Sequence, residues 1–552
     1  MAPTPHPSPS ERRMDIASQR PAELALADTP VPARALRRAT ARQLVLSAGG
    51  VGVIGDLVLR ASERGINLAA YLALVVVTTG VTLVAHRGSL PKPTAKLLAI
   101  ALLFICLLGV RDSSPLTVWN VLAVAVAISC AFAAADGFRH VRMVRVRDLI
   151  AAAWDSARGA VIGGFLFLRY DARDALSISS TRLYVTRLVL RGLALAGVVA
   201  AGFAMLLAVG DPVFASTLAV PLHWDPEPII EHLVMIGVLG WPILGLQWSA
   251  TIGHDLAADR PQRVTSDTWW PQLNKLDVLS ILSALNALFA IFVLVQLRVL
   301  FGGTAYVLAT TGLTMAEYAR SGFFTLMAAS ALVLVTLLVL NATVRDASIN
   351  SWKASRRLSL SLLVFVGVVL ASAATRMALY VGAFGASIER FYAFGAMLWL
   401  AGVMVLFAST VLRNRPRYFA IGTLTSAWVS LLAFNVVNTE AIVTRMNLQR
   451  VAPGVSFDAR YALSLGADAI PALVNGLVAV PVAAMATLDL NSETSACHVA
   501  RALLADWGPA SARSLAGWNL SVWRARRTVA ANELALRQRA CVAPASSAPR
   551  KQ

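Results

Sequence analysis

Charged and amide side chains stand inside or beside apolar segments of this chain. Gln296 and Arg298 lie within the apolar run 276–300, and Glu317 and Arg320 precede the next apolar run. A charge at that depth in a bilayer needs a partner or water. An arginine fork can hold a carboxylate or a phosphate through two hydrogen bonds, so the spacing predicts either an anion-binding cluster or buried ion pairs.

Other polar residues stand at the ends of apolar segments. The charges of the loops, described below, place these ends at the same membrane face as Arg298 and Glu317. One interpretation is a polar cavity that binds an anionic headgroup or a carboxylate. The alternatives are buried ion pairs that fix helix register, such as Arg298 with Glu317 and Arg376 with Asp211, or arginines that extend to the interface. The candidates for ligand binding or buried ion pairing are Asp211, Gln296, Arg298, Glu317, Arg320, Arg376, Tyr380 and Asn435.

Residues for catalysis or metal binding are not grouped in the sequence. His223 stands near Asp225 and His254 beside Asp255, but neither pair has the further partner that a metal or acyl-transfer site needs. No Walker A loop, kinase signature or HExxH motif occurs. We therefore expect no catalytic residue, no metal and no cofactor, and the sequence favours a protein that is not an enzyme.

The elements that would carry the polar candidates are membrane-spanning helices. Hydrophobic residues make up 57% of the 552 residues and charged residues 14%, against roughly 25% charged in soluble domains. The apolar residues occur in blocks of about twenty, the length of a helix that crosses a bilayer. The blocks predict an all-α, polytopic transmembrane helix bundle of eleven spans, at residues 43–60, 67–85, 96–111, 116–136, 187–209, 229–252, 276–300, 322–341, 358–381, 391–411 and 418–437.

Basic residues predict the orientation of the bundle. Lys and Arg concentrate before the first span and in alternate loops such as 86–96, 253–275 and 342–357, while the loop 210–228 has none. Basic loops stay in the cytoplasm, so we expect a cytoplasmic N-terminus and, after eleven spans, an extracytoplasmic C-terminus. This distribution also accounts for the net charge of +19 without a nucleic-acid partner. Only five of the 49 Lys and Arg residues are Lys, a bias that is typical of GC-rich bacterial genomes, so the expected location is the bacterial plasma membrane.

Three regions precede, interrupt or follow the spans. Residues 1–42, rich in Pro, Ala and Arg, predict a disordered basic cytoplasmic tail before the transmembrane domain 43–437. In the loop 137–186, arginines alternate with apolar residues, which predicts either an amphipathic segment on the inner leaflet or a helix pair under the bundle. Residues 438–552 predict a small, mainly helical extracytoplasmic domain.

Glycine and proline mark expected ends of helices. Gly302 and Gly303 would close the helix that contains the run 276–300. Pro471 and Gly508 would break the helical content of the C-terminal region.

The four cysteines divide into two pairs by position. Cys106 and Cys130 fall in expected spans, where cysteine is usually an inert apolar residue. Cys497 and Cys541 follow the last span, on the side where disulfides persist. We predict a disulfide between Cys497 and Cys541, with two unpaired thiols as the alternative.

Several short motifs, most of them near the outer ends of the spans, carry a family resemblance. They are Asp211-Pro212-Val213-Phe214, Gln296-Leu297-Arg298, Phe301-Gly302-Gly303, Glu317-Tyr318-Ala319-Arg320, Gly322-Phe323-Phe324, Arg376-Met377, Leu379-Tyr380, Asn435, Asn438, Tyr461, Asp468-Ala469-Ile470-Pro471, Trp518-Asn519, Arg524, Arg526 and Arg527. With these residues the chain resembles bacterial multi-pass membrane proteins of domain-of-unknown-function family 4173, related to family 4153. The resemblance covers roughly residues 43–540. It implies a fold and a location, and no activity.

Three classes of function remain open on the sequence. The first, which we favour, is a membrane component without enzymatic activity that binds a lipid, an envelope precursor or a partner at its outer face. The others are a secondary transporter and a membrane enzyme that acts on a lipid-linked substrate. The expected partners are membrane lipids, anionic lipids among them, and a membrane or envelope protein.

Overall fold

The structure is a computed structural model that describes residues 31–60, 65–135, 146–172, 175, short pieces between 188 and 205, 227–253, 273–311, 323–343, 349–450, 457–479, 496–509 and 517–540. Every regular element in these ranges is a helix, as the sequence predicts. Ten of the described helices are long and apolar enough to cross a membrane. The prediction of an all-α, polytopic helix bundle is therefore confirmed.

The chain forms two compact units, each built from several segments. The first comprises Met1–Leu57, Leu74–Pro91 and Trp154–Pro261. The second comprises Val58–Ala73, Lys92–Ala153 and Gln262–Gln552. The boundaries of the three predicted domains stay a prediction.

The first unit is held together by close contacts of helix backbones. Its main helices are α3 (Val31–Leu59), most of α4 (Ile66–Arg87), most of α7 (Val146–Tyr170) and α11 (Glu227–Ala250). A Cβ added to Gly52 of α3 would lie 2.6 Å from the carbonyl O of Ile236, and one added to Gly240 would lie 2.7 Å from that of Ala48. The two contacts are one turn apart and run in opposite directions along the chain, so α3 and α11 pack antiparallel.

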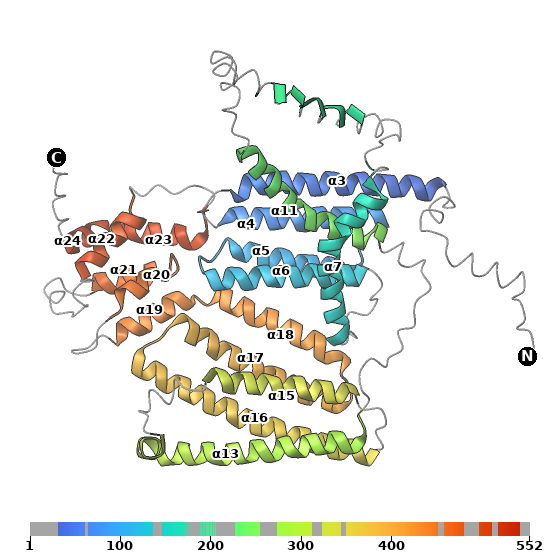
Figure 1. Ribbon diagram of the computed structural model, residues 1–552. Coiled ribbons are helices and arrows are strands. Elements are labelled where there is room, and N and C mark those ends of the chain that lie inside the picture. The colour runs from blue at the N-terminus through green and yellow to red at the C-terminus, as the bar shows by residue number, and fades with distance from the viewer. Residues whose placement is uncertain are drawn as a thin grey trace, which may run out of the picture. The chain divides into compact units, whose positions relative to one another are not determined.

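Helix α7 lies within the segment 137–186, which the sequence predicts to be a cytoplasmic loop without a span. Gly163 and Gly164 pack against α11, and an exposed apolar stripe of Ile150, Trp154, Val161, Phe165 and Leu168 runs along another face. Residues 148–170 are also long and apolar enough to cross a membrane. Figure 1 shows α7 running across the direction of α3. Its position in the inner leaflet stays a prediction.

Two predicted spans differ from the ten candidates in the structure. The span 96–111 corresponds to α5 (Lys92–Leu108), whose 17 residues cover about 25 Å, somewhat less than the roughly 30 Å of a bilayer core. The predicted span 187–209 lies largely outside the described residues.

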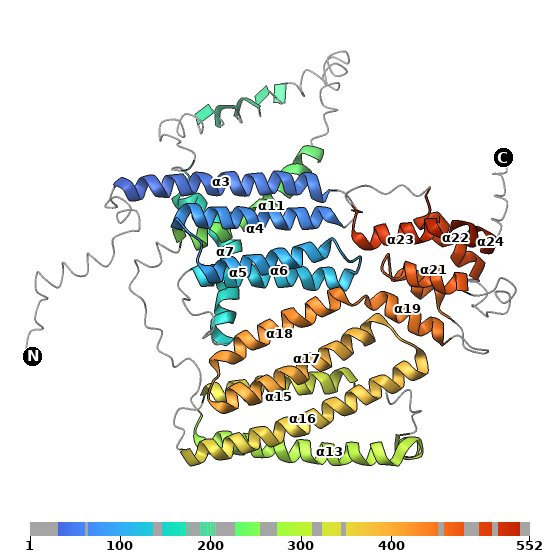
Figure 2. The ribbon, with the colours of Figure 1, turned by 180° about the vertical axis from the view of Figure 1, so that it is seen from behind.

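The second unit contains the larger set of long helices. Figures 1 and 2 show them side by side, with the pair α5 and α6 followed by α18, α17, α15, α16 and α13. Helices α13, α15, α16, α17 and α18 share a continuous apolar cluster that includes Leu282, Leu337, Leu362, Val366 and Phe407. The bounds are α6 (Ser114–Ala135), α13 (Lys275–Thr311), α15 (Phe323–Thr343), α16 (Ile349–Phe384), α17 (Ile388–Thr410), the 3-10 helix η3 (Val411–Arg413) and α18 (Arg417–Val436).

Helix α13 does not end where the sequence predicts. It continues through Gly302 and Gly303 to Thr311, so the expected stop at these glycines is wrong. Glycine costs only about 1 kcal/mol relative to alanine inside a helix, and no proline follows to break the hydrogen bonding. In Figure 1 the last turns of α13 point away from its long axis, which fits the tolerance of paired glycines for a bend.

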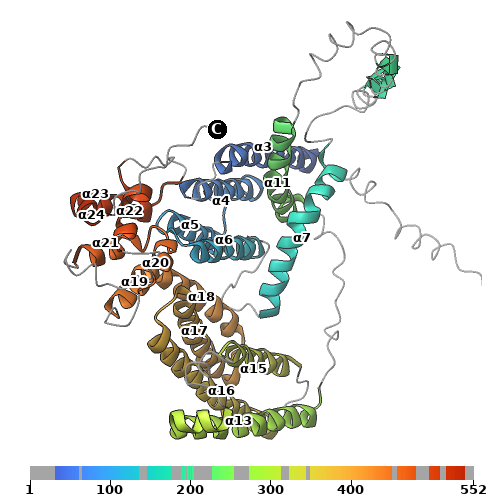
Figure 3. The same cartoon turned by 60° about the vertical axis from the view of Figure 1, so that its left-hand side comes forward.

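The C-terminal helices form a second core beyond one end of these long helices. They are α19 (Thr439–Gln449), α20 (Ala459–Ser464), α21 (Ile470–Ala479), α22 (Ala496–Trp507), α23 (Leu520–Ala531) and α24 (Glu533–Arg539). Ile470, Leu473, Leu503 and Leu536 are fully buried among them. Figure 3 shows α20 to α24 as one cluster. Pro471 stands in the first turn of α21, where its missing N–H is harmless.

Candidate functional site

Two of the predicted site residues meet between α13 and α16. Gln296 is buried, and its side-chain oxygen accepts hydrogen bonds from Arg376 Nη2 at 2.6 Å and from Ser372 Oγ at 3.0 Å. Arg376 is half-buried. These hydrogen bonds link α13 to α16.

The other candidates near these helices have different surroundings. The Arg298 side chain is exposed near the end of the run 276–300. Asp211, Glu317 and Arg320 lie outside the described residues, so the pairs predicted for them stay predictions. Tyr380 is half-buried one turn beyond Arg376.

Asn435 belongs to a separate network, which we call the polar joint: Arg111, Asp112, Asn120, Asn435, Asp468 and Ser521. The side-chain amides of Asn435 and Asn120 donate to each other's oxygens, both at 2.9 Å. Arg111 donates from Nε to the Asn435 carbonyl at 2.8 Å and from Nη2 to the Val436 carbonyl at 2.7 Å. The arginine thereby satisfies carbonyl groups at the C-terminus of α18.

Asp468 completes the polar joint from the C-terminal helices. Its carboxylate accepts from Arg111 Nη1 at 2.9 Å, from the Asp112 backbone N at 2.7 Å and from Ser521 Oγ at 2.5 Å. Both ionic side chains are almost fully buried. The buried ion pair and its hydrogen bonds hold α5, α18 and α23 together, and each of the three guanidinium nitrogens of Arg111 already donates to the protein.

A second buried carboxylate lies close to the polar joint without such partners. Glu440 is 1% exposed, and within the described ranges no donor meets hydrogen-bond geometry with either of its oxygens. Burial raises the pKa of Glu440, and the charge of Asp468 adds to the rise. The Ser113 hydroxyl and the Arg111 guanidinium oppose the rise without cancelling it.

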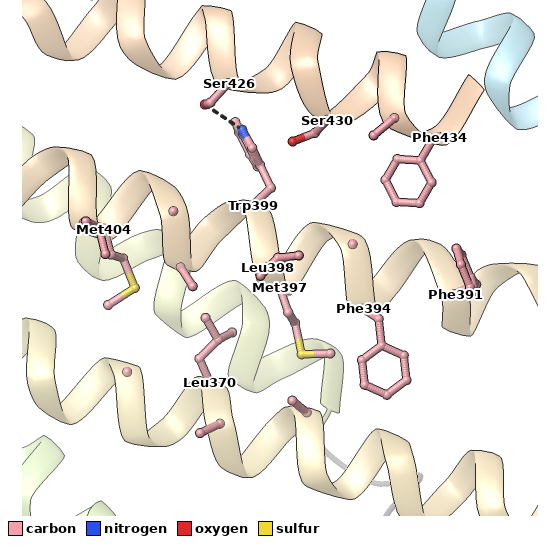
Figure 4. A pocket seen from close by; sticks show the side chains of 18 of the residues that line it. Leu370, Phe391, Phe394, Met397, Leu398, Trp399, Met404, Ser426, Ser430 and Phe434 are labelled. Atoms are coloured by element: carbon pink, nitrogen blue, oxygen red, sulfur yellow. Dashed lines mark hydrogen bonds between the residues drawn. The ribbon is translucent and has the colours of Figure 1, made fainter. Parts of the chain in front are cut away.

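An apolar groove between α16, α17 and α18 could hold a ligand. Its volume is about 1480 Å³, and it is lined mostly by aliphatic and aromatic side chains. Figure 4 shows Leu370, Met397, Leu398 and Phe394 along its wall and Phe434 opposite Phe391. The few polar side chains include Ser426, whose hydroxyl accepts a hydrogen bond from Trp399 Nε1 at 3.1 Å.

The groove follows the long helices over the depth of a bilayer. Its lining on α16 runs from Leu360 to Val381, roughly 30 Å at 1.5 Å per residue, which matches the thickness of the hydrocarbon core. Val364, Leu398 and Val405 of its lining are 63%, 77% and 68% exposed, so the groove is open along its length. Small-molecule pockets are typically smaller, roughly 300–1,000 Å³.

A single arginine stands at one end of the groove. Arg390 lines it near Ala386 and Ser387, its guanidinium lies 4.2 Å from the centre of the Tyr380 ring, and it donates to the Gly385 carbonyl. Among the described residues, no carboxylate forms an ion pair with it. The predicted candidate Tyr380 therefore positions a cation that sequence reasoning did not single out.

The end of the groove beside Arg390 is held by the C-terminal helices. Asn447 of α19 donates to the Ala386 carbonyl at 2.8 Å and accepts from its N–H at 2.8 Å. The Tyr461 hydroxyl accepts from the Ile388 N–H at 2.9 Å. These contacts fix the turn between α16 and α17, and Met446 of α19 joins the lining.

Arg111, Glu440 and Arg390 were missed as site residues because each stands near the end of an apolar run, where arginine and glutamate are common. The sequence signal was the position of Arg111 directly after an apolar block and of Glu440 three residues after the last one. A one-dimensional pattern does not show which of these end residues the C-terminal helices cover.

The described residues were also compared with the requirements of metal sites and disulfides. In the part of the chain that the structure describes, no group of three His, Cys, Asp or Glu side chains is placed to hold a metal ion. Cys106 and Cys130 are free thiols, and Cys497 is disulfide-bonded. The predicted partner Cys541 lies outside the described residues, so the pairing stays a prediction.

Comparison with known proteins gives a family and no activity. The family model described as Domain of unknown function (DUF4153) matches residues 97–476, which include the polar joint up to Asp468 and the whole groove. The chain matches no curated protein and no solved structure. Membership of the related family 4173 stays a prediction. Because the match covers more than half of the chain, the protein belongs to the family of Domain of unknown function (DUF4153).

Proposed function

We propose that this multi-pass membrane protein binds an acidic membrane lipid, without catalysing a reaction on it. The observation that carries the proposal is the groove of about 1480 Å³ between α16, α17 and α18 with Arg390 at one end. Acyl chains would lie along the apolar lining, and the acidic head would reach the guanidinium. The loop charges predict that this end faces the outside of the cell.

The charge and the packing at the Arg390 end support an anionic headgroup. The Tyr380 ring and the Gly385 carbonyl hold the guanidinium in place, so less freedom is lost when a phosphate binds. Arg390 stands in the first turn of α17, where the helix dipole favours a negative charge.

Lipid analysis of the purified, full-length protein tests the proposal. Gly367 and Gly402 line the groove, and a Cβ at either meets nothing within 4 Å, so Gly367→Phe with Gly402→Phe should fill the groove without a clash at the backbone. We expect the wild type to retain acidic lipid through detergent purification and the filled variant to lose it. Arg390→Gln should reduce the preference for acidic over zwitterionic lipid roughly fivefold, the effect of about one charge.

A matched control separates filling of the groove from a general effect of substitution. Gly382 also lies on α16 with nothing within 4 Å of an added Cβ, but it does not line the groove. Gly382→Leu should retain as much lipid as the wild type. Equal retention by the filled variant and the wild type, or no lipid in the wild type, would contradict the proposal.

A further inference from the structure

Helix α23 carries two opposite faces of different character. Ser521, Val522, Ala525 and Val529 are buried in the core of the C-terminal helices. On the opposite face, Trp523 is 43% exposed and Arg524 and Arg527 are exposed. The helix contains no acidic residue, and in the described part of the chain no ion pair involves Arg524 or Arg527.

Trp518 extends this face at the start of the helix. It is 41% exposed and directly precedes Asn519, whose side chain caps α23 by accepting from the Val522 N–H at 2.7 Å. The Arg527 guanidinium lies 5.2 Å from the centre of the Trp523 ring, within the range of a cation–π contact. We call Trp518, Trp523, Arg524 and Arg527 the Trp–Arg face.

Backbone contacts set the height of the Trp–Arg face relative to the membrane. The Trp518 carbonyl accepts from the N–H of Ile66 at 3.1 Å, and Ile66 is the first residue of α4, a helix long and apolar enough to cross a membrane. The Leu520 N–H donates to the Gly109 carbonyl at 2.9 Å, and Ser521 Oγ donates to the Val110 carbonyl at 2.9 Å, directly after α5. The start of α23 therefore lies where these helices meet the headgroup layer.

The composition of the face fits that layer. The polar headgroup region is about 5–8 Å thick on each side of the hydrocarbon core, and Trp523 stands about 6 Å along the helix from its cap. Tryptophan is enriched at this depth, and arginine binds lipid phosphates through its fork. We propose that the Trp–Arg face of α23 docks on the headgroups of anionic lipids in the leaflet next to it. The inference does not rest on the groove.

Photo-crosslinking in the full-length protein tests the inference. Benzoylphenylalanine replaces Trp523, and the protein is reconstituted in nanodiscs of equimolar phosphatidylglycerol and phosphatidylcholine. Mass spectrometry of the cross-linked peptide then counts the two lipid adducts. Two arginines near an anionic surface correspond to a preference of roughly 30-fold for phosphatidylglycerol, which is about 2 kcal/mol at 1.4 kcal/mol per factor of ten.

Variants in the same background distinguish charge from proximity. Arg524→Gln with Arg527→Gln should reduce the preference for phosphatidylglycerol to near unity, and Arg524→Lys with Arg527→Lys should keep most of it. As a positional control, the cross-linker replaces Leu534, which is 78% exposed on α24. Figures 1 and 2 show α24 beyond α23 on the side away from α5, so this position should give few lipid adducts.

Two results would overturn the inference. One is the absence of lipid adducts at position 523. The other is an equal ratio of phosphatidylglycerol to phosphatidylcholine adducts in the protein with both arginines and in the variant with both glutamines. Neither result bears on lipid retained in the groove, because the lining of the groove includes no residue of α23.

Discussion

At the scale of single residues, two carboxylates beside the polar joint have opposite environments. Asp468 accepts three hydrogen bonds, one of them from Arg111. Glu440 is as deeply buried but accepts none from the described residues. Burial therefore favours the protonated form of Glu440, because the Ser113 hydroxyl and the Arg111 guanidinium compensate only in part for the lost hydration.

The raised pKa of Glu440 predicts how stability changes with pH. The folded protein holds this proton above the ordinary pKa of 4.5, where the unfolded chain releases it. The free energy of unfolding should therefore fall as the pH rises from 4.5 to the pKa of the folded state, by about 1.4 kcal/mol for each unit of the shift. Glu440→Gln should remove this fall, measured as the Tm in detergent over a series of pH values.

An exposed glutamate supplies the control for this experiment. Glu389 is exposed in the first turn of α17, so Glu389→Gln should leave the pH dependence of the Tm as it is in the wild type. A Glu440→Gln variant whose Tm falls with pH as steeply as that of the wild type would refute the assignment.

At the scale of elements, glycines set how closely the helices of the first unit approach. A Cβ at Gly245 of α11 would meet backbone oxygens of α7, one of them the Ala160 carbonyl at 2.9 Å. Backbone atoms cannot move aside as a flexible side chain can. The contact is therefore possible only for a residue without a Cβ.

Alanine substitutions at two positions of α11 test this dependence. Gly245→Ala should push α7 and α11 apart and lower the stability by about 1–3 kcal/mol, the usual cost of overpacking. Gly237 of the same helix has nothing within 4 Å of an added Cβ, so Gly237→Ala should be neutral or stabilise by up to about 1 kcal/mol. Thermal unfolding of both variants in detergent measures the difference, and equal Tm values would show that the helices do not meet at Gly245.

At the scale of the whole molecule, the membrane topology depends on whether α7 crosses the bilayer. Residues 148–170 are long and apolar enough to cross a membrane. If they crossed it in addition to the eleven predicted spans, the basic loops 253–275 and 342–357 would move to the side opposite the N-terminal arginines. The charge distribution therefore predicts that α7 stays at the inner face.

Phosphatase fusions to the chain in cells measure this topology. A fusion after Asn447, at the end of α19, should be active because the enzyme needs the oxidising outer compartment. A fusion after Arg357, at the start of α16, should be inactive. An active fusion after Arg357 together with an inactive one after Asn447 would reverse the predicted orientation and would fit a crossing by α7.

The sequence by itself determined the class of this protein, because blocks of about twenty apolar residues can satisfy their backbone in a bilayer only as helices. It also singled out Gln296, Arg376, Tyr380 and Asn435 as polar candidates within or near the ends of apolar runs, since such residues stand out there. Only the tertiary structure decided their partners: Gln296 meets Arg376, Tyr380 holds Arg390, and Asn435 joins Asn120 and Arg111. These contacts join residues up to 324 positions apart in the sequence. The spacing of apolar residues along a helix shows which face is buried, but not which other helix packs against that face. The stop expected at Gly302 failed for a related reason, because a glycine permits a helix to end and only the surrounding packing decides whether it does.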